Sequence, residues 1–182
     1  MRRVMTAVRE VDRSEFPTLA RTFARAFDDD PVMAWFLPNE QKRPARIEKF
    51  FRDVELGGPF GRDGLVCATD GLAAGAIWLP PGKWRLGGWD QLRTLPQFLR
   101  HISWRYVPSR VAAFQQIEQR HPPEPLHWYL ATLGTDPVRQ GQGSARRCSP
   151  TSSPAATPTA CPATSSRRRR RTSPSTRGTG SS

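Results

Sequence analysis

The spacing of apolar residues predicts one strand and two helices in the first third of the chain. Apolar and polar residues alternate over residues 3–9, which predicts a short strand. Apolar residues then recur every three or four positions over residues 16–27, which predicts an amphipathic helix ending at the acidic run and proline of residues 28–31. A second helix is predicted over residues 40–56. The apolar faces are Phe16, Leu19, Phe23 and Phe27 in the first helix, and Ile47, Phe50, Phe51 and Val54 in the second.

The middle of the chain adds a hairpin, two further helices and a strand. Strands are predicted over residues 65–69 and 72–79, because the Asp-Gly pair between them is a strong hairpin signal. Helical spacing returns around residues 89–102 and 107–120. Residues 127–134 are rich in aromatic side chains and predict another strand. This mixture of strands and helices places the chain in the α/β class in the broad sense.

A glycine-containing loop follows the last predicted strand and is the segment with the clearest chemistry. Residues 135–145 have the sequence Thr-Asp-Pro-Val-Arg-Gln-Gly-Gln-Gly-Ser-Ala. Glycine permits positive φ and close approach of the backbone to a ligand, and successive N–H groups in such a loop bind phosphate oxygens. A surface turn rich in Gly and Gln has the same pattern, so the loop by itself leaves both interpretations open.

Three residues of this loop fit the acetyl-CoA motif of the GNAT superfamily of N-acetyltransferases, and the chain resembles that family. The motif is Gln or Arg, two residues, Gly, one residue, then Gly or Ala, and it is matched by Gln140, Gly143 and Ala145. The resemblance extends over most of residues 1–145. It includes the opening strand, the Phe-rich helix with its Asp-Asp-Pro, the Ala-Ile-Trp-Leu-Pro-Pro of the third strand and the fourth strand with its preceding Glu-Pro. The chain is most similar to puromycin N-acetyltransferase-like actinobacterial members.

The resemblance implies an α/β (α+β) fold of GNAT type, with a mixed central sheet and flanking helices, truncated after the fourth strand. It also implies acetyl-CoA as cosubstrate, no metal, and transfer of the acetyl group to the amine of a small molecule. In that family the positions of Leu133, Gly134 and Thr135 offer backbone groups to the pantetheine arm. The family's pyrophosphate loop corresponds here to Gln140, Gly141, Gln142, Gly143, Ser144 and Ala145.

The sequence offers few residues for acid and base chemistry. His127, at the start of the fourth strand, is a candidate general base, and an imidazole packed at the strand edge is the alternative. Glu118 and Glu124 would act through water. The tyrosine that protonates the leaving thiolate in the family is absent from the chain as translated, and Tyr129 is expected to pack.

The helices of residues 89–120 form an insertion that is expected to shape the acceptor pocket. Four tryptophans in or near the insertion would provide an aromatic wall for the amine, and packing in a core or on a packed insertion is the alternative that we favour. These tryptophans are Trp78, Trp84, Trp89 and Trp104. No partner is predicted for His101 or His121.

Composition divides the chain near residue 145. Residues 146–182 contain eight Arg and no acidic, aromatic or large aliphatic residue, and they supply +8 of the net charge of +12. Such a segment cannot bury a core, so a disordered basic tail is predicted after a domain of residues 1–145. Taken at face value, the tail would bind nucleic acid through counterion release, without specific recognition of sequence.

A frameshift accounts for this tail better than a basic binding segment does. Back-translated with GC-leaning codons and shifted by one base from Arg146, one solution contains a helix, a strand and Asn-Val-Ala-Phe-Tyr before Gly-Phe, in the order that the family requires. We therefore expect that one base is lost near codons 144–147. The pyrophosphate loop would then lose its helix, because Pro150 and the Ser/Thr-rich tail oppose one. The 182-residue chain would have poor solubility and no measurable acetyl transfer.

Two further functions are left open by the sequence, a non-catalytic CoA-binding remnant and a basic-tail nucleic-acid-binding protein. No apolar run approaches the ~20 residues of a membrane span, and the N-terminus lacks the apolar core of a secretory signal. We therefore expect a cytoplasmic protein with no membrane partner and no specific nucleic-acid partner. Its expected partner is the small-molecule amine acceptor.

Overall fold

The computed structural model describes residues 7–85, 87–102, 104–122 and 124–148, without the side chains at positions 98, 118, 146 and 147. The predicted disordered tail and the nucleic-acid binding considered for it therefore lie outside the described residues, apart from the short segment that ends at Cys148.

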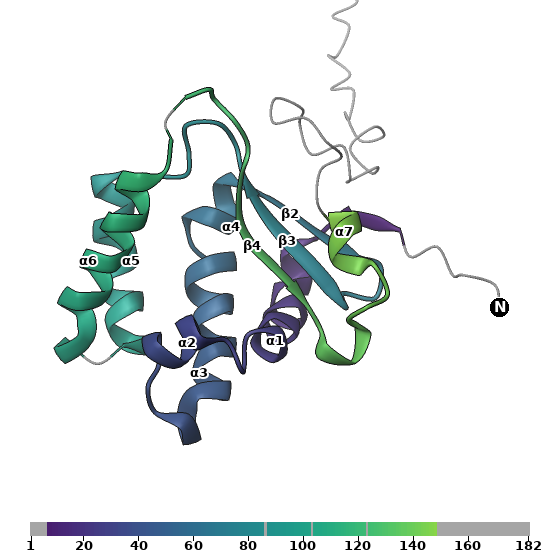
Figure 1. Ribbon diagram of the computed structural model, residues 1–182, viewed down its shortest axis with the longest axis horizontal. Coiled ribbons are helices and arrows are strands. Elements are labelled where there is room, and N and C mark those ends of the chain that lie inside the picture. Colours follow the sequence, from purple (N-terminus) through teal and green to yellow (C-terminus); the bar gives the residue numbers. More distant parts are fainter. Residues whose placement is uncertain (1–6, 86, 103, 123, 149–182) are drawn as a thin grey trace, which may run out of the picture.

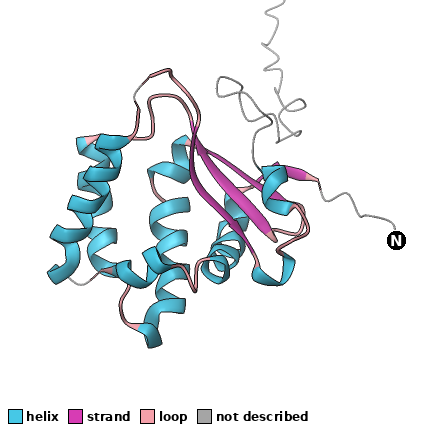
Figure 2. Ribbon diagram, in the orientation of Figure 1, coloured by secondary structure: helices cyan, strands magenta, loops and turns pink. Residues whose placement is uncertain are grey.

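Four antiparallel strands form one sheet in chain order (Figure 1). They are β1 (Val8–Glu10), β2 (Leu65–Thr69), β3 (Ala74–Leu79) and β4 (Tyr129–Thr135). Strand β4 pairs with β3, and its other edge has no partner strand among the described residues. With helices packed around this sheet (Figure 2), the predicted α/β class is confirmed.

Strand β4 contains one residue more than β3 in the middle of their ladder. Ile77 pairs with Thr132 and the next residue, Trp78, pairs with Leu130, so Ala131 has no opposite residue. A bulge of this kind interrupts the alternation of side chains between the two faces of a sheet. As a result, Ala131 and Thr132 both face the helices on the same side of the sheet.

Helices cover the sheet unequally. Helix α1, helix α3 and the π-helical turn η3 pack against one face and enclose the larger apolar core. The α-helices and η3 are α1 (Phe16–Ala26), α2 (Pro31–Phe36), α3 (Arg43–Phe50), η3 (Phe51–Leu56), α4 (Pro59–Asp63), α5 (Gly88–His101), α6 (Val107–Arg120) and α7 (Ser144–Cys148). Short 3-10 turns are η1 (Arg13–Glu15), η2 (Glu40–Lys42), η4 (Trp104–Tyr106) and η5 (Pro137–Arg139).

Helix α1 lies close to the sheet because two glycines leave room for it. Leu19 and Phe23 are fully buried, as the predicted apolar stripe requires. A Cβ atom added at Gly75 would lie 2.7 Å from Leu19, and one added at Gly134 would lie 2.7 Å from Phe23. Phe23 also packs on Phe51 of η3, with ring centroids 5.2 Å apart. The core therefore depends on small residues in the strands as much as on large ones in the helix.

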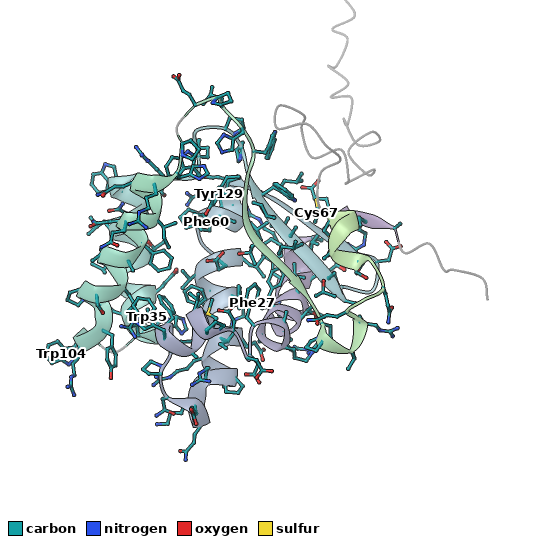
Figure 3. All side chains as sticks on the ribbon, in the orientation of Figure 1. Phe27, Trp35, Phe60, Cys67, Trp104 and Tyr129 are labelled. Atoms are coloured by element: carbon teal, nitrogen blue, oxygen red, sulfur yellow. The ribbon has the colours of Figure 1, made fainter. Side chains whose placement is uncertain are left out.

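Helices α5 and α6 form a pair that stands beside α3 and η3 rather than over the sheet (Figure 1). Their apolar stripe is only partly covered, with Leu92 59% and Phe114 44% exposed. Trp104 lies at the outer tip of the pair and is 78% exposed (Figure 3). Of the helices in the described part of the chain, none is long and apolar enough to cross a membrane.

Helix α7 packs on the face of the sheet opposite α1. Cys148 is 1% exposed there, and its carbonyl accepts a hydrogen bond of 3.1 Å from the Trp78 indole N–H. We expected no helix after the glycine loop, and this expectation is wrong, because α7 follows the loop and continues to Cys148. Pro150 restricts only its immediate neighbours, and burial of Cys148 stabilises the turn that precedes it.

Two predicted elements differ from the structure in detail. The helix predicted over residues 40–56 passes through 3-10, α and π geometry in turn, as η2, α3 and η3. The hairpin turn is longer than an Asp-Gly pair, because the strands end at Thr69 and resume at Ala74. Leu72 has a φ of 52° and is buried, so it belongs to this turn and not to the predicted strand.

Candidate functional site

The glycine loop connects the end of β4 to α7. Gly141 and Gly143 have φ of 73° and 77°, in the left-handed region that glycine adopts without strain. A Cβ atom at either position would meet nothing within 4 Å. The two glycines are therefore required by backbone conformation and not by close packing. The predicted loop residues, Gln140 to Ala145, form one continuous turn that runs into the first residues of α7.

Asp136 and Arg25 hold the start of this loop against α1. The Asp136 carboxylate is 2.7 Å from the Arg25 guanidinium and accepts a hydrogen bond of 3.2 Å from the backbone N–H of Val138. The Gln140 side chain also donates a hydrogen bond of 3.3 Å to the Thr135 carbonyl. Asp136 is the single acidic residue in the sequence from 127 to 148, and its ion pair with Arg25 offsets its negative charge. The sequence did not indicate Arg25, because 111 positions separate it from Asp136.

The predicted pantetheine residues lie at the end of β4, an edge strand whose outer side has no partner strand in the described part of the chain. Leu133 packs against the cluster on the α7 side of the sheet, and Gly134 faces Phe23 of α1. The Thr135 hydroxyl is buried and has no hydrogen-bond partner among the described residues. Such an edge offers backbone N–H and C=O groups to an extended ligand, and a buried hydroxyl without a partner marks a place for a polar group.

Glu55 is a candidate site residue that the sequence did not indicate. It lies in the π-helical turn η3, and Oε2 of its carboxyl group accepts a hydrogen bond of 3.1 Å from the Thr132 hydroxyl on β4. Burial raises the pKa of Glu55 to about 7, and the hydrogen bond from Thr132 opposes that change. An available signal was its position four residues after Phe51, on the apolar side of the predicted helix. Irregular helical turns of this kind occur frequently at functional sites.

A cavity of about 460 Å³ opens beside Glu55, between η3, α4, α5 and α6. Its walls are mostly apolar, and Glu55 is the ionisable residue among those that line it. The apolar walls are formed by Phe50, Val54, Pro59, Phe60, Leu92, Leu95, Val111 and Phe114. This volume is within the range of small-molecule sites. Residues of the predicted insertion, 89–120, therefore line part of this cavity.

The four tryptophans do not form the wall of this pocket. Trp78 is buried under α7, whereas Trp89 and Trp104 are more than 75% exposed. Trp84 packs edge-on against His121, with ring centroids 4.4 Å apart. The aromatic residues that line the cavity are phenylalanines instead. Trp78 and Trp84 therefore meet the expectation of packing, whereas Trp89 and Trp104 do not, because the insertion stands beside the sheet and leaves its outer residues open.

His127, the predicted base, pairs with another histidine. Its Nε2 is 2.9 Å from Nε2 of His121, and its Nδ1 is 2.7 Å from the Pro125 carbonyl. Burial, followed by the neighbouring His127 and Arg85, lowers the pKa of His121. His127 does not line the cavity beside Glu55, so the structure does not bring the two candidates together. The other imidazole without a predicted partner, that of His101, has its Nε2 3.4 Å from Asp53 Oδ2.

The other predicted acids contribute no site. Glu124 is exposed and does not line the cavity, and the side chain of Glu118 lies outside the described residues. Tyr129 packs against His121, with ring centroids 4.9 Å apart, as expected of a packing residue (Figure 3). Among the described residues considered as acids or bases, Glu55 therefore combines an ionisable group, a cavity and a contact with β4.

Comparison with known proteins supports the fold. No protein-family model matches the chain. A solved structure from Corynebacterium glutamicum, described as histone acetyltransferase HPA2 and related acetyltransferase, is similar with a TM-score of 0.54 at 19% sequence identity. The match covers 78% of this chain and 66% of that one, which is less than two thirds of the neighbour's length. The predicted GNAT-type α/β fold, with its central sheet and flanking helices, is thereby confirmed.

Proposed function

We propose that this chain carries the acetyl-CoA site of an N-acetyltransferase whose acceptor is the amine of a small molecule. The observation that carries the proposal is the end of β4, where an open strand edge leads into a loop with two left-handed glycines. Support also comes from the GNAT-type fold and from the match of Gln140, Gly143 and Ala145 to the family motif.

The residues present fit the two ends of such a ligand. The turn at Gly141 and Gly143 would supply backbone N–H groups to the pyrophosphate, and the ion pair with Arg25 keeps Asp136 from repelling it. Leu133, Gly134 and Thr135 would hold the pantetheine arm along the strand edge. The buried Thr135 hydroxyl is available to a polar group of that arm. Acetyl-CoA itself would supply the acetyl thioester.

Binding of acetyl-CoA to the purified 182-residue chain tests this proposal. We expect acetyl-CoA to raise the thermal unfolding temperature in a concentration-dependent manner, because a ligand that binds only the folded state stabilises it. Gly143→Ala should weaken binding at least about tenfold, since φ of 77° is strained for alanine. Gly71→Ala is the matched control, because Gly71 has open space around it and no positive φ. Absence of any stabilisation at about 1 mM acetyl-CoA would contradict the proposal.

The same samples separate the alternative functions. Acetyl-CoA binding that depends on Gly143, together with release of free thiol when an amine is added, is the result expected of an acetyltransferase. Binding without transfer is the result expected of a CoA-binding remnant, and equally of an acetyltransferase chain that lacks the second half of its domain. Binding of nucleic acid that falls steeply with salt, with no response to acetyl-CoA, would favour the basic-tail alternative.

A further inference from the structure

We infer that the cavity between η3, α4, α5 and α6 is the acceptor subsite, that it takes a primary amine with an apolar body, and that Glu55 receives a proton from that amine. This inference rests on the proposed function, because it assigns the second substrate of the same reaction. It concerns a carboxyl group and a pocket that have no part in the acetyl-CoA loop.

The walls of the cavity select for an apolar body. Phe50, Phe60 and Phe114 bring aromatic surface to it from three different helices. On the outer side, Leu92 is 59% and Leu95 is 40% exposed, although both belong to the apolar stripe of α5. Apolar side chains that line a pocket without filling it gain from contact with a ligand that displaces water.

The charge of the cavity selects for an amine. Glu55 is the ionisable residue in the lining, and the remaining polar side chains there are neutral. A carboxylate within apolar walls attracts a cation more strongly than one in water, because the local dielectric constant is low. An ammonium group on an apolar body therefore matches both features of the pocket, whereas a carboxylic acid or a sugar matches neither.

The position of Glu55 connects the cavity to β4. Its hydrogen bond with Thr132 fixes the carboxyl group against this strand. Thr132 and Gly134 face the same side of β4, two residues apart, which is about 7 Å along a strand. The β4 bulge is what brings Thr132 to this side. An amine held by Glu55 thus lies beside the strand that is proposed to hold the thioester.

The protonation state of Glu55 suits the transfer of a proton from the amine. Burial raises its pKa to about 7, so the carboxyl group changes charge near neutral pH. Several of the charges on the surrounding elements are paired with one another, whereas basic side chains such as Lys49 of α3 and Arg100 of α5 have no ion pair among the described residues. The paired charges are Arg52 with Asp53 on η3, His101 of α5 with Asp53, Arg62 of α4 with Asp90 of α5, and Glu48 of α3 with Arg21 of α1.

The resulting step balances in atoms and electrons. The ammonium group gives one proton to the Glu55 carboxylate, and the nitrogen lone pair then attacks the thioester carbonyl carbon. The nitrogen–carbon bond forms, the carbon–sulfur bond breaks, and the electron pair of that bond leaves on sulfur. The second proton of the nitrogen ends on the sulfur, which gives the amide and a free thiol. Glu55 then returns its proton to solvent.

Three small probes test the subsite in the full chain without requiring turnover. We expect 2-phenylethylamine to bind, as measured by titration calorimetry at pH 8, and ethanolamine to bind at least about tenfold more weakly, because it lacks the apolar body. Glu55→Gln should weaken the binding of 2-phenylethylamine at least about tenfold and leave the affinity for the neutral 2-phenylethanol unchanged. Glu40→Gln, which removes an 87% exposed carboxylate elsewhere, should change none of these affinities.

Proton release tests whether the ammonium group binds the carboxylate form of Glu55, the state that can accept a proton from the amine. At pH 6, binding of 2-phenylethylammonium should expel the proton from Glu55, and titrations in buffers of different ionisation enthalpy should show release approaching one proton. The Glu55→Gln variant should show none. If the wild-type chain binds the amine without proton release, or with an affinity that Glu55→Gln does not change, the inference is overturned.

Acetyl-CoA titrations on the same samples separate the two claims. Acetyl-CoA binding without amine binding would overturn the acceptor subsite and leave the proposed function standing. Amine binding without acetyl-CoA binding would contradict the proposed function, and the assignment of the cavity as an acceptor subsite would fall with it. Leu92→Lys provides a second variant at an exposed position of the cavity rim, and its added positive charge should weaken binding of the amine.

Discussion

Replacement of Glu55 by Gln should make the protein more stable at alkaline pH and not at acidic pH. The wild-type carboxyl group is neutral in the folded chain below its raised pKa of about 7, and Gln is a close neutral substitute there. Above that pH the folded chain must hold a carboxylate among apolar side chains, which the variant avoids. The Gln side-chain oxygen can still accept the hydrogen bond from Thr132.

The size and sign of this effect follow from the pKa of Glu55 in the two states. The pKa of Glu55 is raised from 4.5 to about 7 in the folded chain, so protonation of Glu55 stabilises the folded state. This stabilisation is complete below pH 4.5 and is lost as the pH rises through 7. The difference corresponds to about 3 kcal/mol over the whole range. Between pH 5 and pH 8.5 the stability of the variant relative to wild type should therefore rise by about 2–3 kcal/mol.

Urea unfolding of both proteins at these two pH values measures the difference. A constant offset, for example from the unpaired amide N–H of Gln, would shift both values equally and leave the change with pH intact. Glu40→Gln is the control, because it removes a carboxylate that is 87% exposed. A difference between Glu55→Gln and wild type that is the same at both pH values would refute the reasoning.

Two further predictions concern β4 and the coding sequence. Gly134→Ala should reduce the free energy of unfolding by about 1–3 kcal/mol in urea titrations, because its Cβ would lie 2.7 Å from Phe23, whereas Gly71→Ala should have little effect. An equal loss in both variants would contradict this packing argument. DNA sequencing across codons 140–150 and beyond should show an open shifted frame encoding the second half of an acetyltransferase. A stop codon in that frame within codons 146–182 would eliminate the frameshift hypothesis.

Periodicity predicted the long elements because burial on one side is enough to define them. The stripes of α1, α5 and α6 and the aromatic run of β4 all appear within about two residues of the expected positions. The π-helical turn after Phe50 was not predictable, since six residues are too few to separate its period from that of an α-helix. The left-handed conformation of Leu72 was missed for a different reason, because its apolar side chain fits the pattern of the adjoining strand.

The candidate site divides in the same way between local and long-range features. The glycine loop is a local motif, so its turn was predictable from the sequence, whereas its assignment as a pyrophosphate loop came from the family resemblance. Glu55 meets Thr132 across 77 positions, and the pairing of Arg25 with Asp136 is longer still. Contacts of this kind depend on how the helices pack on the sheet. His121 and His127 are close in sequence, and the prolines between them signal a turn without indicating that the two rings meet.

The bulge in β4 connects these observations into one arrangement. In a regular strand, Thr132 would follow the alternation of Leu130 and face the α7 side of the sheet, away from Glu55. The extra residue at Ala131 reverses this and brings the hydroxyl of Thr132 to the carboxyl group in η3. Gly134, two residues further, keeps the strand close to α1 and leads to the glycine loop. The proposed acetyl-CoA edge and the contact of Glu55 with Thr132 therefore lie next to each other on β4, beside a single irregularity of the sheet.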